Sequence, residues 1–288
     1  MLGIAGGIVL GLLVGSFLNV VIYRLPIMMD RDWRQQCREM MDNTSVADQP
    51  ADGLATFNLF TPRSRCPDCE TQIKAWQNIP VISWLLLRGR CAACEAPISG
   101  RYPLIELVTG LLSGAMIWQF GAGLAGLAAL LFIWCLIALT VIDLDHQLLP
   151  DSITYPLLWS GLLLSAIGPA YDLPMPDLYS SVLGAAAGYL SLWGIYWLFK
   201  LATGKEGMGY GDFKLLAALG AWLGYQQLPV VILMSAAVGA ITGIGMIAVL
   251  GRDRQIPIPF GPYLAGAGLI TLLWGDQLVT TYLNYAGL

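Results

Sequence analysis

The chain has 288 residues, of which 57% are hydrophobic and 12% are charged, and its formal net charge is −4. Soluble domains carry about 25% charged residues, so this composition, with a mean hydropathy of +0.66, indicates an integral membrane protein with several spans. The chain has a single histidine, which argues against a metalloprotease because such enzymes need two or three histidine ligands.

The first apolar run covers residues 2–22. It has neither a basic start nor an Ala-x-Ala cleavage site, so we predict a membrane helix that is retained. Glycines recur every four residues along one face of this helix, at Gly3, Gly7, Gly11 and Gly15. That spacing is typical of membrane helices that pack closely. Asn19 lies in the same run and needs a polar partner there.

A polar insert follows at residues 24–101 and holds ten of the fifteen basic residues. Residues 42–56 lack apolar periodicity, which predicts a flexible loop. The insert then carries two Cys-x-x-Cys pairs, formed by Cys66, Cys69, Cys91 and Cys94. Such paired spacing is typical of a zinc site with four thiolates. Two disulfides are the alternative, and they require an oxidising compartment.

Seven more apolar runs follow, at 104–120, 124–142, 153–168, 180–200, 213–226, 229–250 and 262–283. A membrane helix needs about 20 residues, so the runs at 153–168 and 213–226 are short. We expect an all-α polytopic membrane protein of about eight transmembrane helices, with a cytoplasmic zinc-binding insert after the first. The predicted domains are the first transmembrane helix at 1–23, the insert at 24–101 and a seven-helix core at 102–288.

Basic residues favour the cytoplasmic side of a membrane. With eight spans and an N-terminus outside, all fifteen fall in cytoplasmic segments, which are the insert and the positions Lys200, Lys205, Lys214, Arg252 and Arg254. This partition predicts a multi-pass protein with periplasmic termini and a cytoplasmic insert. A reducing cytoplasm then favours zinc over disulfides at the four cysteines.

Two acidic positions reach the same predicted face. Asp143 closes a helix that runs inward, and Asp212 opens a helix that runs outward, directly after Gly207-Met208-Gly209-Tyr210-Gly211. Acids at a membrane edge indicate function, and the glycines permit close approach and unusual backbone angles. Two carboxyl groups that share one proton are what an aspartyl protease needs: one takes a proton from water, and the other donates to the peptide carbonyl. We therefore predict that Asp143 and Asp212 are the catalytic pair.

Four neighbouring residues are predicted to support this site, namely Gly209, Gly211, Asp145 and Asp151. Asp145 lies two residues beyond Asp143 and so points to another face of the helix. Asp151 follows Pro150 at the start of the next helix, as an N-cap residue would, and a catalytic role for it stays open. Glu106 lies in the first turn of its helix, where an acid is favoured, so we interpret it as structural.

Gly209-Tyr210-Gly211-Asp212 resembles the Gly-x-Gly-Asp motif of membrane aspartyl proteases. Nearly the whole chain resembles the bacterial type IV prepilin peptidases. The other matching motifs are residues 143–151, Gly15-Ser16-Phe17-Leu18-Asn19-Val20, the four cysteines, Lys205-Glu206-Gly207-Met208 and Pro259-Phe260-Gly261-Pro262-Tyr263. In this resemblance the family's catalytic pair falls on Asp143 and Asp212.

The resemblance implies an endopeptidase that removes the basic leader from prepilins and pseudopilins of type IV pili and type II secretion. It places that activity at the cytoplasmic face of the bacterial inner membrane. Many members then N-methylate the new N-terminal residue with S-adenosylmethionine, and the methylating members carry the four-Cys insert. The insert has no Gly-x-Gly-x-x-Gly loop, so the residues that bind the methyl donor stay unknown. We expect membrane lipid around the protein and no nucleic-acid partner.

Two other functions fit part of the pattern. A proton-coupled transporter also places acids and broken helices in the membrane, where the aspartates would relay protons. It predicts inverted repeats, which the two halves do not show convincingly, and it leaves the four cysteines unexplained. A zinc-binding docking module on an inert membrane anchor explains the cysteines, but it does not explain acids gathered at one face.

Overall fold

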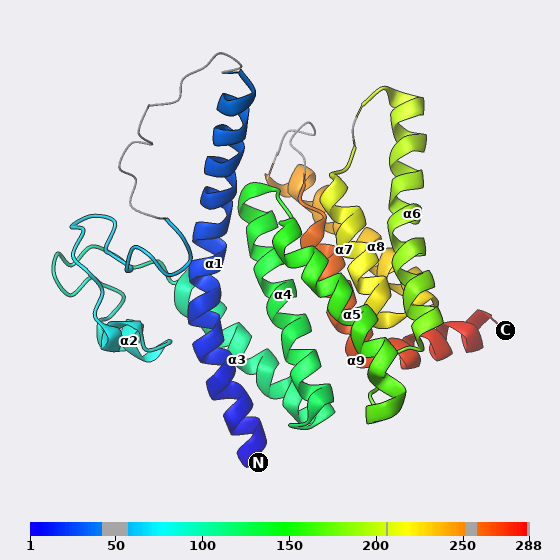
Figure 1. Ribbon diagram of the computed structural model, residues 1–288, viewed down its shortest axis with the longest axis horizontal. Coiled ribbons are helices and arrows are strands. Elements are labelled where there is room, and N and C mark those ends of the chain that lie inside the picture. The colour runs from blue at the N-terminus through cyan, green and yellow to red at the C-terminus, as the bar shows by residue number, and fades with distance from the viewer. Residues whose placement is uncertain (42–56, 206, 251–257, 287–288) are drawn as a thin grey trace. The chain divides into compact units, whose positions relative to one another are not determined.

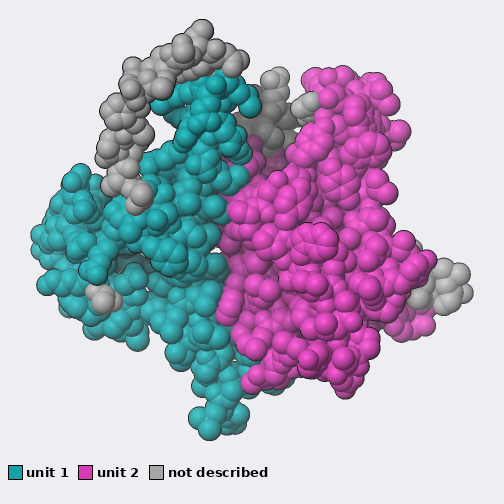
Figure 2. All heavy atoms as spheres, viewed as in Figure 1, with its two compact units in different colours: residues 1–118 teal, residues 119–288 magenta. Residues whose placement is uncertain are grey.

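The computed structural model describes residues 1–41, 57–205, 207–250 and 258–286. The chain divides into two compact units, Met1–Trp118 and Gln119–Leu288, which Figure 2 shows in separate colours. In the described part of the chain the regular elements are helices, with two isolated β-bridges, so the predicted all-α class is confirmed. Some predicted features lie outside the described residues: the flexible loop at 42–56, Glu206 of one motif, and the basic residues Arg252 and Arg254.

In the first unit, helix α1 (Leu2–Met41) packs closely against α3 (Arg101–Phe120). A Cβ atom added at Gly7 would lie 2.7 Å from Ile117 Cγ1, and one added at Gly15 would lie 2.8 Å from Glu106 Cα. These distances are too short for a side chain, so the glycines let the two helices approach. The glycine spacing therefore has the packing role predicted for it.

Polar contacts join α1 to the rest of the first unit. The Asn19 side-chain amide donates to the Tyr102 carbonyl at 3.2 Å, which supplies the polar partner predicted for Asn19. The helix continues past residue 23 and through Pro26 to Met41. The buried Arg24 guanidinium donates to the carbonyls of Asn58 (2.8 Å) and Pro62 (2.6 Å) and so ties α1 to the insert. The predicted domain limits at residues 23 and 101 stay a prediction.

Between residues 57 and 100 the insert contains two short helices, η1 (Ala75–Asn78) and α2 (Ile82–Leu86). The buried Glu106 carboxylate of α3 accepts the backbone N–H of Val81 at 2.8 Å, just before α2 begins. Glu106 lies in the second turn of α3 and not in the first turn as predicted. Its contact still agrees with a structural interpretation, because the carboxylate satisfies a backbone donor at the start of α2.

In the described residues, the second unit is a bundle of five long helices and one shorter helix, α7. They are α4 (Leu124–His146), α5 (Asp151–Tyr171), α6 (Leu178–Thr203), α7 (Tyr210–Leu223), α8 (Leu228–Leu250) and α9 (Gly261–Ala286), with a short turn, η2 (Tyr225–Gln227), before α8. Helix α7 contacts α5, α6, α8 and α9, and Figure 1 shows it inside the bundle. All but one of its residues from Asp212 to Trp222 are buried. The short apolar helix is therefore the centre of this unit.

Close backbone contact holds α6 against α7. A Cβ at Gly188 would lie 2.6 Å from the Leu216 carbonyl oxygen, and one at Gly184 would overlap the Gly220 carbonyl. On the other side of α7, the Trp222 indole donates to the Leu157 carbonyl of α5 at 2.7 Å. These contacts set the position of α7, which carries Asp212 in its first turn.

Six of the described helices are long and apolar enough to cross a membrane: α1, α3, α4, α5, α6 and the segment Tyr225–Met246, which includes most of α8. The expected polytopic membrane fold is thus confirmed, although about eight spans were predicted. Helix α7 has only 14 residues, or about 21 Å of length, and it lies within the bundle. Short or interrupted helices are tolerated at membrane depth when protein surrounds them.

Candidate active site and metal site

Asp143 lies in the last turn of α4, and its side chain is only 5% exposed. Its carboxylate oxygen Oδ2 accepts the backbone N–H of Gly261, the first residue of α9, at 2.9 Å. The helix ends just beyond, because Gln147 adopts a left-handed conformation (φ 52°) and its N–H donates to the Asp143 carbonyl at 2.9 Å. The turn of the chain and the start of α9 together hold this acid in place.

Asp212 lies in the first turn of α7 and is 7% exposed. Its backbone N–H donates to the carbonyl of Gly209, the residue that precedes the helix, at 3.2 Å. The Asp143 and Asp212 carboxyl groups are close enough to interact electrostatically. The fold thus brings together the two acids predicted as a pair, both buried, at one end of the same bundle.

Two of the glycines before Asp212, Gly207 and Gly211, are required for space, whereas a Cβ at Gly209 would lie 3.9 Å from Asp212 Oδ2, an ordinary contact distance. Gly209 has an ordinary extended conformation (φ −80°, ψ 149°). A Cβ at Gly207 would lie 2.8 Å from the Phe199 ring, and one at Gly211 would lie 2.8 Å from Leu149 Cβ. The expectation of unusual backbone angles is wrong, because none of these glycines has a left-handed φ. At Gly207 and Gly211, neighbouring side chains occupy the room that a methyl group would need.

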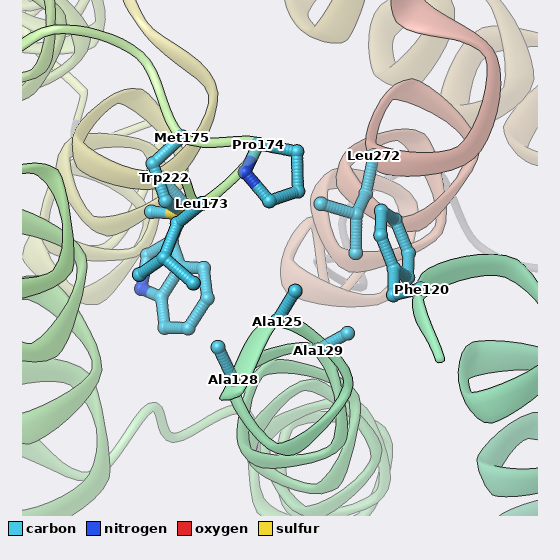
Figure 3. A pocket seen from close by; sticks show the side chains of 9 residues that line it. All are labelled: Phe120, Ala125, Ala128, Ala129, Leu173, Pro174, Met175, Trp222 and Leu272. Atoms are coloured by element: carbon cyan, nitrogen blue, oxygen red, sulfur yellow. The ribbon is translucent and has the colours of Figure 1, made fainter. Parts of the chain in front are cut away.

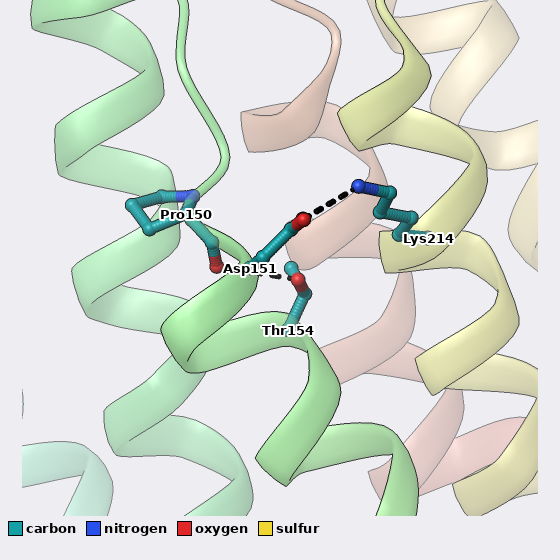
Figure 4. Close-up of polar contacts among 4 residues, drawn as sticks. All are labelled: Pro150, Asp151, Thr154 and Lys214. Carbon is teal, nitrogen blue, oxygen red and sulfur yellow. Dashed lines mark hydrogen bonds and ion pairs between the residues drawn. The ribbon is translucent and has the colours of Figure 1, made fainter. Parts of the chain in front are cut away.

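Asp151 does not cap α5. Pro150 holds the N-cap position, and Asp151 is the first helical residue. Both of its carboxylate oxygens accept from the Lys214 ammonium at 2.7 Å (Figure 4). Figure 4 also shows Thr154, whose hydroxyl donates to the Pro150 carbonyl at 3.2 Å. The capping interpretation is therefore wrong, since the side chain points across to α7 and joins the starts of two helices.

Asp145 is exposed at the end of α4, unlike the buried Asp143. The structure thus places the two acids on different sides of the helix, because residues two apart in a helix do not share a face. Of the acids in this stretch, Asp143 is the buried one, and it interacts electrostatically with Asp212. The supporting role predicted for Asp145 stays a prediction.

Aromatic side chains surround the start of α7. The Tyr210 ring lies 5.4 Å from the rings of both Tyr196 and Phe213, and Tyr196 lies 5.7 Å from Phe213. The Lys200 ammonium donates to the Tyr196 hydroxyl at 3.2 Å. Aromatic contacts of this kind stabilise by roughly 0.5–1.5 kcal/mol each beyond area burial, so they hold the first turn of α7 against α6.

The four cysteines of the insert form a single cluster. Their sulfur atoms all lie within 4.8 Å of one another, so together they can hold a metal ion. The Cys66 and Cys94 sulfurs are 3.8 Å apart and those of Cys69 and Cys91 are 4.0 Å apart. The cysteines are free, so the disulfide alternative is not the arrangement observed.

Two matching turns present these thiols. In one, Cys66 N–H donates to the Thr71 carbonyl and Glu70 N–H donates back to the Cys66 carbonyl; Cys91, Ala96 and Glu95 repeat this pattern in the other. Thr71, through its side chain and its backbone, lowers the pKa of Cys69 to about 6, and the backbone N–H of Ala93 lowers the pKa of Cys91. Both effects favour the thiolate, which is the form that binds metals.

The comparisons with known proteins agree with this arrangement. A family model described as the bacterial peptidase A24 N-terminal domain matches residues 9–120, and one described as the type IV leader peptidase family matches residues 130–244. A protein of Stutzerimonas stutzeri, named prepilin leader peptidase/N-methyltransferase, is 58% identical over 98% of this chain and 94% of its own length. Relatives with the same name from Aeromonas hydrophila and Pseudomonas aeruginosa are 56% and 54% identical, over 95% and 97% of this chain and 91% and 93% of their own lengths.

The chain belongs to the type IV leader peptidase family. The resemblance predicted from its motifs is thereby confirmed. Asp143 and Asp212 both lie in the segment that matches the leader peptidase model, and the four cysteines lie in the segment that matches the N-terminal domain. The relatives give no support to the alternative of a proton-coupled transporter. No solved structure matches the chain.

Sequence reasoning missed three residues at the site of this leader peptidase family member. Gly261 was noted only within a motif, Leu149 only as part of the acidic stretch, and Lys214 only as a cytoplasmic charge. For Lys214 a signal existed, because it is a lone cation in the first turns of α7. Gly261 and Leu149 could not be found from the sequence, because their roles depend on packing between segments that are far apart in it.

A shallow apolar pocket lies at the other end of the second unit (Figure 3). It is lined by alanines at the start of α4, by the loop after α5, and by Trp222 at the end of α7. Asp143 and Asp212 lie at the opposite ends of these two helices. The pocket is therefore remote from the paired acids.

Proposed function

We propose that the chain is a membrane-embedded aspartyl endopeptidase that removes the leader peptide from type IV prepilins and then N-methylates the new N-terminal residue. One observation carries the catalytic part. Two buried carboxyl groups, Asp143 at the end of α4 and Asp212 at the start of α7, interact electrostatically in a member of a leader peptidase family. Buried carboxyl groups that interact at close range favour sharing a single proton.

In this mechanism the pair shares one proton, and the titration belongs to the pair. The ionised carboxylate takes a proton from a water molecule, whose oxygen attacks the scissile carbonyl. The protonated carboxyl group donates to the carbonyl oxygen as negative charge develops there. Burial of both acids favours this chemistry, because a low dielectric strengthens their mutual interaction.

We propose a structural zinc ion on Cys66, Cys69, Cys91 and Cys94. Four thiolates around zinc at about 2.3 Å form a tetrahedron with edges of about 3.8 Å. The Cys66–Cys94 and Cys69–Cys91 sulfur separations of 3.8 and 4.0 Å are close to that edge length, and all four sulfurs lie within 4.8 Å of one another. Such an ion stabilises the insert by joining its two turns, and it takes no part in peptide cleavage.

S-adenosylmethionine is the proposed methyl donor, in keeping with the name of the relatives. We assign no residue of this chain to its binding. Prepilins and pseudopilins are the proposed substrates, with membrane lipid around the helices. An apolar substrate helix can lie in the bilayer with its cationic leader in the cytoplasm, beside the paired acids.

The proposed location is the bacterial inner membrane, with both termini in the periplasm and the insert and active site facing the cytoplasm. The distribution of basic residues supports this orientation. The acid-rich end of α4 is proposed to attract the cationic leader. Asp151 contributes little to that attraction because Lys214 already neutralises it. Asp145 is exposed and is the better candidate.

The decisive experiment is cleavage of a purified prepilin in detergent by wild type, Asp143→Asn and Asp212→Asn. Each substitution preserves shape and removes the titratable group. We expect each to abolish cleavage while the folded protein still binds substrate. Asp172→Asn, at an exposed acid at the far end of α5, is the control and keeps the activity. Near-full activity in Asp143→Asn or Asp212→Asn would disprove the catalytic pair.

A second experiment separates the two activities. Chelation of the metal should abolish methylation and spare cleavage, because the cysteine cluster belongs to the insert and the paired acids belong to the other unit. Loss of both activities together would contradict this division.

A further inference from the structure

Leu149 lies between two glycines that belong to different helices. It is buried in the turn between α4 and α5. A Cβ at Gly211, beside Asp212, would lie 2.8 Å from Leu149 Cβ and 3.3 Å from its Cδ1. A Cβ at Gly261, which binds Asp143, would lie 3.1 Å from Leu149 Cδ2. The leucine therefore touches the backbone beside one acid and the backbone that holds the other.

Gly261 has a second close neighbour, the acid itself. A Cβ there would lie 2.6 Å from Asp143 Oδ2 and 3.1 Å from its Cγ. Neither Gly211 nor Gly261 adopts the left-handed conformation that favours glycine. Alanine at either position therefore forces a neighbouring side chain to move, because space is short, and the backbone conformation itself imposes no strain. The obstacles differ: at Gly211 the nearest atoms all belong to Leu149, whereas at Gly261 the nearest belong to Asp143.

We propose that Gly261 and Leu149 are positioning residues that set the geometry of the carboxyl pair. This inference rests on the proposed function. Gly261 acts through its backbone N–H, which fixes the rotation of the Asp143 carboxylate, and through its missing side chain, which leaves the carboxylate room. Leu149 acts as a spacer. It separates the start of α7, with Asp212, from the start of α9, which binds Asp143.

The expected effect follows from the distances. Ordinary contacts of a Cβ atom begin at about 3.4 Å, so a methyl group at Gly261 must displace the Asp143 carboxylate by about 0.8 Å. Misplacement of a reacting group by about 1 Å costs about 10²-fold in rate. We therefore expect Gly261→Ala to lower kcat by about 10²-fold with little change in KM, because substrate binding does not require the disturbed geometry.

Gly266 supplies a matched control on the same helix, since nothing lies within 4 Å of a Cβ built there. Gly266→Ala should keep wild-type kcat and KM. If Gly261→Ala behaves like Gly266→Ala, the positioning role of Gly261 is refuted. A loss of folded protein in Gly261→Ala would be seen as a fall in the folded, monodisperse fraction in detergent, and the double variants below then provide the test.

Leu149→Gly is combined with each glycine substitution in turn. Gly211→Ala should lose activity, and Gly211→Ala with Leu149→Gly should regain part of it, because the nearest obstacle is Leu149 Cβ, which glycine lacks. Gly261→Ala with Leu149→Gly should not regain activity over Gly261→Ala, because the Asp143 carboxylate still blocks the methyl group. Such coupling between neighbours is what double-mutant cycles measure. Rescue of both glycine variants, or of neither, would overturn the spacer role.

The outcomes keep this inference apart from the proposed function. If Asp143→Asn or Asp212→Asn still cleaves prepilin, the proposed function fails whatever the glycine variants do. If both aspartate variants are inactive and the glycine variants match the control, only the positioning inference fails.

Discussion

The contact between α6 and α7 provides a direct test of the fold, through substitution of Gly188 by alanine. Gly188 lies in the interior of α6, where its missing side chain lets the backbone of α7 approach. Gly194 lies further along the same helix with nothing within 4 Å of a built Cβ. The two glycines therefore share a helix but differ in surroundings, and the pair isolates the effect of packing.

The expected magnitudes have opposite signs. Replacing glycine by alanine inside a helix favours folding by roughly 0.8–1 kcal/mol, so Gly194→Ala should stabilise the protein by up to about that amount. At Gly188 the new Cβ would lie 2.6 Å from the Leu216 carbonyl oxygen, and the Ala217 Cα lies within 3.2 Å. Both obstacles are backbone atoms, so α7 itself must move. Overpacking of this kind costs about 1–3 kcal/mol, which outweighs the helix term.

The assay is thermal unfolding in detergent, with wild type, Gly188→Ala and Gly194→Ala measured side by side. A change of about 1 kcal/mol shifts Tm by roughly 2–4 °C for a protein of this size. We expect Gly188→Ala to melt lower than wild type and Gly194→Ala to melt at the same temperature or higher. Cleavage should also fall in Gly188→Ala, because α7 carries Asp212. Equal Tm values for the two variants would refute the argument that α7 is held by backbone contact.

Three further predictions follow from other contacts. Lys214→Met should lower the free energy of unfolding by about 0.5–1 kcal/mol, because it removes a partly exposed ion pair with Asp151. Lys214→Arg should retain the ion pair. Equal Tm values for Lys214→Met and wild type would contradict the prediction. Asp177→Ala should cost about 1 kcal/mol, because Asp177 accepts the Ser180 N–H at the start of α6. Asp177→Asn, which keeps a capping oxygen, is the control. Cys69→Ser should reduce the bound zinc measured by atomic emission, and an unchanged metal content would disprove the four-thiolate site.

Much of this protein is determined by patterns that are local in the sequence. Composition alone indicates a membrane protein, because a chain with so few charged residues would expose too much apolar surface to water. Cysteine spacing indicates a four-thiolate cluster, since each Cys-x-x-Cys pair forms one turn and both ligands of a pair come from neighbouring residues. Helix direction also places Asp143 and Asp212 at the same face. Their catalytic role remains a proposal, but their location at one face was predictable from the number of helices between them.

Only the tertiary structure decided which residues surround those acids. The Gly261 N–H reaches Asp143 across 118 positions in the sequence, and Lys214 reaches Asp151 across 63. No local pattern encodes such contacts, because they depend on how α5, α7 and α9 pack. The reason for the glycines was also hidden: Gly211 is required by a leucine on another segment and not by its own backbone angles. Periodicity and spacing specify which secondary structure a segment can form, whereas steric fit between distant segments specifies how large the side chain at each position can be.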